Sequence, residues 1–303
     1  MLPYATAVEA EAALGRAMTV AEAAWFRYSA ALPDHLLYYQ TIAIILVIYT
    51  VGGVPLALLE LSAPAKDVSV MPYKLQPRAR LSPAEFLRCY LESARLLVLH
   101  GGALGVVSYP AVKMLGLRAG LRLPSAGETA ARLVVYLLVQ DYVTYWIHRV
   151  LHTRWVYRKV HRVHHEFTAP FGFVAQYAHW VDVLLLSVPS MVGPAIVPCH
   201  MTTLWLYFVI LQLIAIDIHS GFDFPLNPTK FIPFYGGAKF HDYHHRIGEH
   251  SQSNFAPTFT YCDYLYGTDK GYTYHKASLA KLAKEMAENN VGEGNVNIFN
   301  KGE

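Results

Sequence analysis

Eight histidines lie in three short clusters whose spacing suits metal binding. They occur as one pair and two triplets: His148 and His152, then His161, His164 and His165, then His241, His244 and His245. The pair is spaced i,i+4 and each triplet i,i+3,i+4, so on a helix each cluster projects from one face. Neutral imidazole is a common ligand of iron, copper and zinc, and eight such ligands exceed what one ion can coordinate. The spacing therefore predicts two metal ions side by side, rather than solvated loops.

Two more histidines and three aspartates could complete this centre. The histidines flank the two ends of a long apolar stretch, and the carboxylates lie near them or on the helical stripe of the first pair. A carboxylate that accepts a hydrogen bond from the far ring nitrogen fixes the tautomer of a ligating histidine. We therefore add as ligand candidates His179 and His219, and as orienting carboxylates Asp141, Asp182 and Asp217. Further acidic candidates are Glu166, Asp242 and Asp263, whereas no metal role is expected for His35, His100, His200, His250 and His275.

The composition indicates a membrane protein. The chain has 303 residues, of which 54% are hydrophobic and only 16% charged, which is too apolar for an ordinary soluble domain. A formal net charge of +3 does not predict nucleic-acid binding. The three cysteines are widely spaced and form no Cys-x-x-Cys, so we expect free thiols. The N-terminus lacks the pattern of a cleaved signal peptide, and residues 19–28 are expected to form an amphipathic helix on a membrane surface.

Four apolar stretches are candidates for membrane helices, at residues 36–59, 96–112, 133–147 and 183–216. The second is broken by Gly101-Gly102, and the third contains Asp141. As one helix the fourth would be roughly 50 Å long, whereas the hydrocarbon core is about 30 Å thick. Three prolines interrupt it, at positions 189, 194 and 198. We therefore expect two helices in a hairpin that enters and leaves on the same side.

Basic residues predict the orientation, because positive charges favour the cytoplasmic side. One group precedes the second apolar stretch and another follows the third: Lys66, Lys74, Arg78, Arg80 and Arg88, then Arg149, Arg154, Arg158, Lys159 and Arg162. This arrangement brings all the histidine clusters to one cytoplasmic mouth. The predicted fold is an all-α integral membrane protein, a transmembrane helical bundle with a cytosolic histidine-rich cap for two metals. We expect membrane-anchoring helices over 1–130, a catalytic domain over 131–272 and a polar tail over 273–303.

The ligand types narrow the choice of metal. No cysteine lies within the clusters, which disfavours thiolate zinc and iron–sulfur sites. Imidazole suits iron, copper or zinc. A site beside a long apolar hairpin suits a hydrophobic substrate, and oxidising an unactivated C–H bond requires a redox metal. We therefore expect iron with O2, with a zinc hydrolase as the alternative.

The histidine series resembles the fatty acid hydroxylase superfamily of membrane di-iron oxygenases. Within it the chain is most similar to the plant sterol 4α-methyl oxidases, or methylsterol monooxygenases, that act on 4,4-dimethylsterols. The resemblance is carried by DYVTYWIHR (141–149), YGGAKFHDYHH (235–245), QSNFA (252–256), YCDYLYGTDKGY (261–272) and the opening PYAT (3–6). The chain departs from that pattern at four positions: Asp182 and Asp217 replace glutamate, Phe222 replaces tyrosine and Leu226 replaces tryptophan.

The resemblance implies a multi-pass enzyme of the endoplasmic reticulum, with its histidine clusters facing the cytosol. Two irons per chain would use O2 to oxidise the 4α-methyl group of a sterol in steps to a carboxylate. Electrons would come from NADPH through a separate reductase and b-type cytochrome, since the chain has no Gly-x-Gly-x-x-Gly nucleotide motif. A separate sterol C-4 decarboxylase would then act on the product.

Two classes of alternative stay open. One is another oxidising enzyme of the superfamily, such as an aldehyde-deformylating oxygenase of wax synthesis, a lipid hydroxylase or a desaturase. The other is an inactive sterol-binding membrane protein. The intact histidine clusters favour an enzyme.

Overall fold

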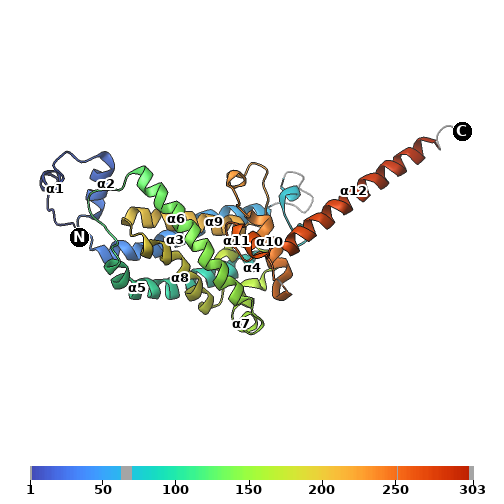
Figure 1. Cartoon of the computed structure of the whole chain (residues 1–303), viewed down its shortest axis with the longest axis horizontal. Helices are drawn as coiled ribbons and strands as arrows, with labels where there is room; N and C mark the ends of the chain where they lie inside the picture. Colours follow the sequence, from blue (N-terminus) through green and yellow to red (C-terminus); the bar gives the residue numbers. More distant parts are fainter. Residues whose placement is uncertain (1, 63–69, 251, 300–303) are drawn as a thin grey trace.

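The chain folds into a bundle of long helices capped at both ends by shorter elements (Figure 1). The computed structural model describes residues 2–62, 70–250 and 252–299, and among these it contains no strand beyond isolated bridges. The bundle consists of α3 (Asp34–Ser62), α4 (Pro83–Leu96), α5 (Gly102–Met114), α6 (Ala126–Leu151), α8 (Trp180–Ile196) and α9 (Met201–Ile218). One end carries α1 (Ala7–Leu14) and α2 (Val20–Ser29). The other carries α7 (Arg154–Lys159), α10 (Gly237–Ile247), α11 (Tyr261–Tyr266) and α12 (Lys270–Phe299), which projects away from the bundle.

Three helical stretches within the described residues are long and apolar enough to cross a membrane: Asp34–Ser62, Pro83–Met114 and Met201–Ile218. The second continues from α4 into α5 through a π-helical turn, Leu97–Gly101, so the predicted interruption at Gly101-Gly102 is a wider turn and not a break. The predicted span at 133–147 lies in α6, which is not among the three and carries Gln140 and Asp141. The predicted all-helical membrane fold is confirmed.

The apolar stretch 183–216 forms two helices, as its prolines predict. Residues 197–200 separate α8 from α9, and Pro198 lies in this break. Pro189 and Pro194 lie within α8 and do not end it. The start of α8 and the end of α9 both reach the clustered histidines, through the contact of Asp182 with His161 and through His219. The hairpin therefore begins and ends at the same end of the bundle.

Close packing joins the helices of the hairpin to the rest of the bundle. Gly193 allows α8 to approach α6, because a Cβ at this position would lie 2.9 Å from Cα of Tyr136. The second helix of the hairpin, α9, packs along α3. These two helices come from different predicted domains, so the division into 1–130, 131–272 and 273–303 stays a prediction. Lys66, one of the basic residues used to predict orientation, lies outside the described residues.

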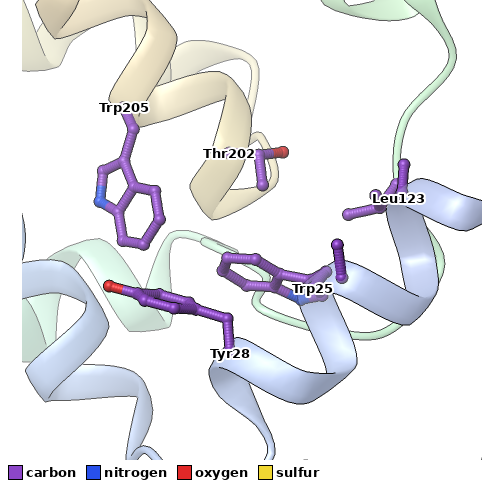
Figure 2. A pocket seen from close by; sticks show the side chains of 7 residues that line it. Trp25, Tyr28, Leu123, Thr202 and Trp205 are labelled. Carbon is purple, nitrogen blue, oxygen red and sulfur yellow. The ribbon is translucent and has the colours of Figure 1, made fainter.

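The N-terminal helices cap the end of the bundle that is remote from the histidines. The predicted helix at 19–28 is α2. It begins after Thr19, and a capping box between Thr19 and Glu22 stabilises this first turn. An apolar pocket of about 330 Å³ lies between α2 and the first turns of α9 (Figure 2). Its walls include Trp25, Tyr28 and Trp205, whose rings pack edge to face. Trp205 precedes His219 by 14 residues of α9, roughly 20 Å along the helix axis, so this pocket is separate from the histidines.

Candidate metal centre

Nine histidines come together at the capped end of the bundle and form two adjacent groups. Within each group the ring nitrogens that face one another all lie within 4.8 Å. Group A contains His148, His152, His161, His165 and His244, and group B contains His164, His219, His241 and His245. All nine side chains are buried, with between 0% and 8% of their surface exposed. The structure thus gathers the eight clustered histidines and His219, and it divides them into two sets.

Each triplet contributes two histidines to one group and one histidine to the other. In the second cluster the i,i+4 pair, His161 and His165, belongs to group A, whereas His164 belongs to group B. In the third cluster the assignment is reversed, since His241 and His245 belong to group B and His244 belongs to group A. Each triplet therefore contributes to both groups, which holds the groups side by side.

The elements that carry the histidines explain these positions. The first pair ends α6, and the third cluster occupies the last two turns of α10. The second cluster lies in a 3₁₀ helix, His161–Glu166, and not in the α-helix that its spacing also allows. Only six residues are available here before the backbone becomes extended at Phe167, and short helical pieces of this length are commonly 3₁₀.

Backbone carbonyls orient several of the rings. Nδ1 of His148 donates to the carbonyl of Phe255 at 2.6 Å, and Nδ1 of His164 donates to the carbonyl of Tyr177 at 2.9 Å. Nδ1 of His219 donates to the carbonyl of Ala215 at 2.8 Å. The ring nitrogen must be the donor in each pair because a carbonyl oxygen can only accept. In the neutral ring Nε2 then keeps its lone pair, as a metal ligand requires.

The same geometry leaves lone pairs facing each other. Nε2 of His164 and Nε2 of His219 lie 3.4 Å apart, and both rings carry their proton on Nδ1. Both ring nitrogens of His152, His165 and His245 are buried without a hydrogen-bond partner among the described residues. A buried polar atom without a partner costs about 1–3 kcal/mol. Bound cations remove this penalty by accepting the lone pairs, so the residues of both groups fit metal ions.

Protonation of the rings does not relieve the unpaired ring nitrogens. Burial lowers the pKa of His161, His165, His241 and His245 well below the usual value of 6.5. These rings are therefore neutral at physiological pH and available as ligands. No cysteine lies in either group, and Cys89, Cys199 and Cys262 are buried free thiols elsewhere in the fold.

Of the three predicted orienting aspartates, Asp182 contacts a clustered histidine. Its Oδ1 lies 3.3 Å from Nδ1 of His161, and both side chains are closed to solvent. Asp141 accepts instead from the backbone N–H groups of Thr258 and Phe259, at 2.8 and 3.0 Å. It thus holds the segment that follows Phe255, whose carbonyl orients His148.

Asp217 binds side chains of the segment that follows His219, and not backbone N–H groups. It accepts hydrogen bonds from Asn227, Thr229 and Tyr235, at distances of 2.7, 3.3 and 2.6 Å. These bonds anchor the loop that joins His219 to α10. None of these three partners is a clustered histidine.

His179 lies outside both groups. It is the N-cap residue of α8, and its Nδ1 accepts from the N–H of Val181 at 3.3 Å. Four of the histidines expected to have no metal role, His35, His100, His200 and His275, are also outside the groups, and the side chain of His250 lies outside the described part of the chain. For example, His200 caps α9 and hydrogen-bonds the carbonyl of Gly120.

Four backbone carbonyls also contribute to the site, although the sequence analysis considered side chains only. They belong to Ala215, Tyr177, Ser253 and Phe255. Each accepts from Nδ1 of one clustered histidine. Backbone carbonyls have no residue-type signal. The run QSNFA contains Ser253 and Phe255, so its resemblance to the superfamily was the one available pointer.

The sequence of the chain is similar to those of several known proteins. The chain is 64% identical to the very-long-chain aldehyde decarbonylase GL1-10 of Oryza sativa subsp. japonica, over 93% of each chain. It is 48% identical to methylsterol monooxygenase 1-1 of Arabidopsis thaliana, over 98% of this chain and 99% of that one. It is also 48% identical to methylsterol monooxygenase 1-2 of the same plant, over 96% and 97%. No solved structure matches the chain.

The family described as Fatty acid hydroxylase matches residues 133–268. This range contains all nine histidines of the two groups, together with Asp141, Asp182 and Asp217. The histidine groups fit a di-iron site, and the relatives indicate a membrane oxidoreductase. By sequence and by the content of its histidine site, the chain belongs to the fatty acid hydroxylase family.

Proposed function

We propose that this chain is a sterol C-4 methyl monooxygenase, which oxidises the 4α-methyl group of 4,4-dimethylsterols with O2. The observation that carries the proposal is the pair of adjacent, buried, all-histidine groups at the end of a membrane-helix bundle. The near full-length similarity to proteins named methylsterol monooxygenase supports the sterol as substrate.

We assign two irons to the site, one to group A and one to group B. Iron supplies the activation of O2, which imidazole ligands permit and a thiolate-free site favours. The protein holds the ligand nitrogens in their neutral tautomers through backbone carbonyls, and burial keeps bulk water away from them. His179, as a helix cap outside both groups, is not included in this ligand set.

The first round of the proposed reaction converts the methyl group to an alcohol. It consumes one O2, two electrons and two protons, places one oxygen atom in the C–H bond and releases the other as water. Two further rounds would give the aldehyde and the carboxylate, which a separate sterol C-4 decarboxylase would consume.

The electrons must come from outside the chain, and we propose NADPH, a separate reductase and a b-type cytochrome as the source. Between His152 and His161 lies α7, which carries the exposed residues Arg154 and Lys159, and the exposed Arg162 directly follows His161. These basic residues are neighbours of group A ligands in the sequence, and Figure 1 shows α7 at the same end of the bundle as α10. A basic surface would attract an acidic electron carrier.

We place the chain in the endoplasmic reticulum membrane with its histidines on the cytosolic side. The same basic residues of α7 support this orientation, because they lie at the histidine-bearing end of the bundle. In the proposed division, residues 1–130 anchor the chain and residues 131–272 carry catalysis.

A second candidate is deformylation of a long-chain aldehyde, as in wax synthesis. The relative that is 64% identical is named as a very-long-chain aldehyde decarbonylase, and the same di-iron site would serve that reaction. Another lipid hydroxylase or desaturase of the family would share the site as well, whereas an inactive sterol-binding protein would not need it.

The deciding experiment supplies both substrates to the same membranes. Membranes that contain the chain should receive NADPH and O2 with either a 4,4-dimethylsterol or a long-chain aldehyde, and products should be identified by mass spectrometry. We expect loss of the 4,4-dimethylsterol with the active chain and not with His161→Ala. Consumption of the aldehyde with an unchanged sterol would overturn the proposal in favour of the second candidate.

A further inference from the structure

The loop between α9 and α10 exposes large apolar side chains beside the metal centre. Over residues 226–234, Leu226 is 88% exposed, Phe231 86% and Phe234 65%. The loop begins shortly after His219 and ends shortly before His241, so it joins two histidines of group B. In Figure 1 this orange loop projects sideways from the bundle, and not along its long axis. Single exposed apolar residues are ordinary, but three on one short loop call for an apolar surrounding.

The loop is held in a defined conformation. Asp217 accepts hydrogen bonds from two loop side chains, Asn227 and Thr229, and from Tyr235, the residue that follows the loop. Asn227 and Thr229 thus bond to Asp217, whereas Leu226, Phe231 and Phe234 face outward. Lys230 is the charged exception, and its ammonium group pairs with Asp223.

The backbone of Phe234 is also held in one conformation, with its side chain exposed. Its φ angle is +61°, which a bulky aromatic residue rarely adopts. The carbonyl of Phe234 accepts from both the N–H and the hydroxyl of Thr260, at 2.7 and 3.2 Å. These bonds hold the uncommon conformation, in which the phenyl ring remains exposed.

Further exposed apolar side chains lie on α11 and connect the loop to α6. Thr260 caps α11, on which Tyr264 and Leu265 are 73% and 68% exposed. The next residue, Tyr266, packs against Trp146 of α6, with ring centroids 4.9 Å apart. Aromatic residues of this kind gather where a membrane protein crosses the lipid–water interface.

On α6 the surface becomes an apolar stripe along the bundle. Val134, Leu138, Tyr142 and Trp146 recur every four residues, and all are exposed. The stripe therefore leads from the side of the helix bundle to the aromatic cluster at α11 and then to the loop. A lipid leaflet that covers α6 would reach the loop at its edge.

We propose that loop 226–234 and the exposed face of α11 insert into the lipid leaflet on the histidine side of the membrane. The partner is the bilayer itself, at the boundary between headgroups and acyl chains. Insertion would bury Leu226, Phe231 and Phe234, and it would place lipid next to the segment that joins His219 to His241. The inference concerns binding to lipid and does not depend on which lipid the enzyme oxidises.

A fluorescent probe at the tip of the loop tests the proposal. The full chain with Phe231→Cys, labelled with an environment-sensitive dye, should be reconstituted in phosphatidylcholine vesicles. The unsubstituted chain controls for labelling of the three buried cysteines. The matched control is Lys159→Cys, an exposed position on α7 at the same end of the bundle. Leu226→Cys is a second loop position, should the first variant fold poorly.

The expected result is emission shifted to the blue at position 231 and quenching by nitroxides on the lipid acyl chains. The dye at position 159 should instead be quenched by aqueous iodide. Equal iodide quenching at both positions would overturn the proposal. Protection of position 231 from both quenchers, with cross-linking between chains, would overturn it as well, because a second copy would then cover the loop.

Discussion

Oδ1 of Asp182 lies 3.3 Å from Nδ1 of His161, and neither side chain is accessible to solvent. Asp182 is in the first turn of α8, whereas His161 lies in the 3₁₀ helix after α7. The contact therefore connects the membrane hairpin to group A. A carboxylate at the far nitrogen of a ligand makes the ring a better donor to the metal and keeps it in one orientation.

Removing this carboxylate should weaken the site without unfolding the bundle. We expect Asp182→Asn to lower metal affinity or turnover by about 10- to 100-fold, the effect typical of a lost carboxylate partner. Iron content and turnover should be measured together, with Asp223→Asn as a control, because Asp223 pairs with Lys230 and Lys239 and with no clustered histidine. Equal iron content and turnover in Asp182→Asn and the unsubstituted chain would contradict a role for Asp182 at the site.

The exchange of histidines between the triplets predicts which substitutions act alike. His244→Ala should resemble His152→Ala, because both residues belong to group A although His244 is carried by α10. His245→Ala should instead resemble His219→Ala, since both belong to group B. Each variant should lose most of one iron and leave a residual spectrum characteristic of the other site.

Iron analysis and Mössbauer spectroscopy of the four purified variants would check this pairing. Matching residual spectra for His244→Ala and His245→Ala would show that neighbours in sequence share a metal, contrary to the observed grouping.

Charge reversal on α7 should affect the supply of electrons and not the chemistry at the site. We expect Arg154→Glu with Lys159→Glu to slow reduction by an acidic carrier protein by about tenfold or more at low salt, since steering charges act mainly on association rates. Reduction by a small chemical reductant should be unchanged. The matched control is Lys276→Glu with Lys281→Glu on α12.

Stopped-flow measurement of metal-centre reduction over a range of salt concentrations provides the check. If reduction by the carrier slows equally in the α7 and α12 variants, the carrier responds to net charge alone, and α7 is not its binding surface.

The N-terminal cap should lose stability in acid. Hydrogen bonds from the Arg16 guanidinium and from the N–H of Thr19 lower the pKa of Glu22 from 4.5 to about 2. A carboxyl with a depressed pKa in the folded state stabilises that state fully above about pH 4.5, and this contribution is lost as pH falls toward 2. Hydrogen exchange of α2 amides should therefore accelerate between pH 4.5 and 2, beyond the intrinsic pH effect.

Glu22→Gln should lower the protection of α2 at pH 6 and remove most of this acid dependence. A variant with unchanged protection at pH 6 would mean that the capping box and the contact with Arg16 do not stabilise the cap.

Local sequence pattern predicted much of this protein because the relevant physics is local. Apolar length indicated the three membrane-capable helices but also suggested a span at 133–147, which lies in α6 and is not among them. Pro198 marked the turn of the hairpin. Histidine spacing identified the eight clustered residues, since residues three and four apart share one helical face. The sequence also predicted a helix at 19–28, which the structure has as α2.

Tertiary structure decided how those histidines are shared. Spacing does not say which histidines share an ion, whereas the fold sends His164 and His244 to the groups opposite to the other members of their triplets. It also separates His219, which joins group B, from His179, which caps α8, although both flank the same hairpin. Likewise, Asp182 contacts a clustered histidine, whereas Asp141 accepts from backbone N–H groups and Asp217 from side chains. These outcomes depend on how α6, α9 and α10 pack together, and residues far apart in sequence set that packing.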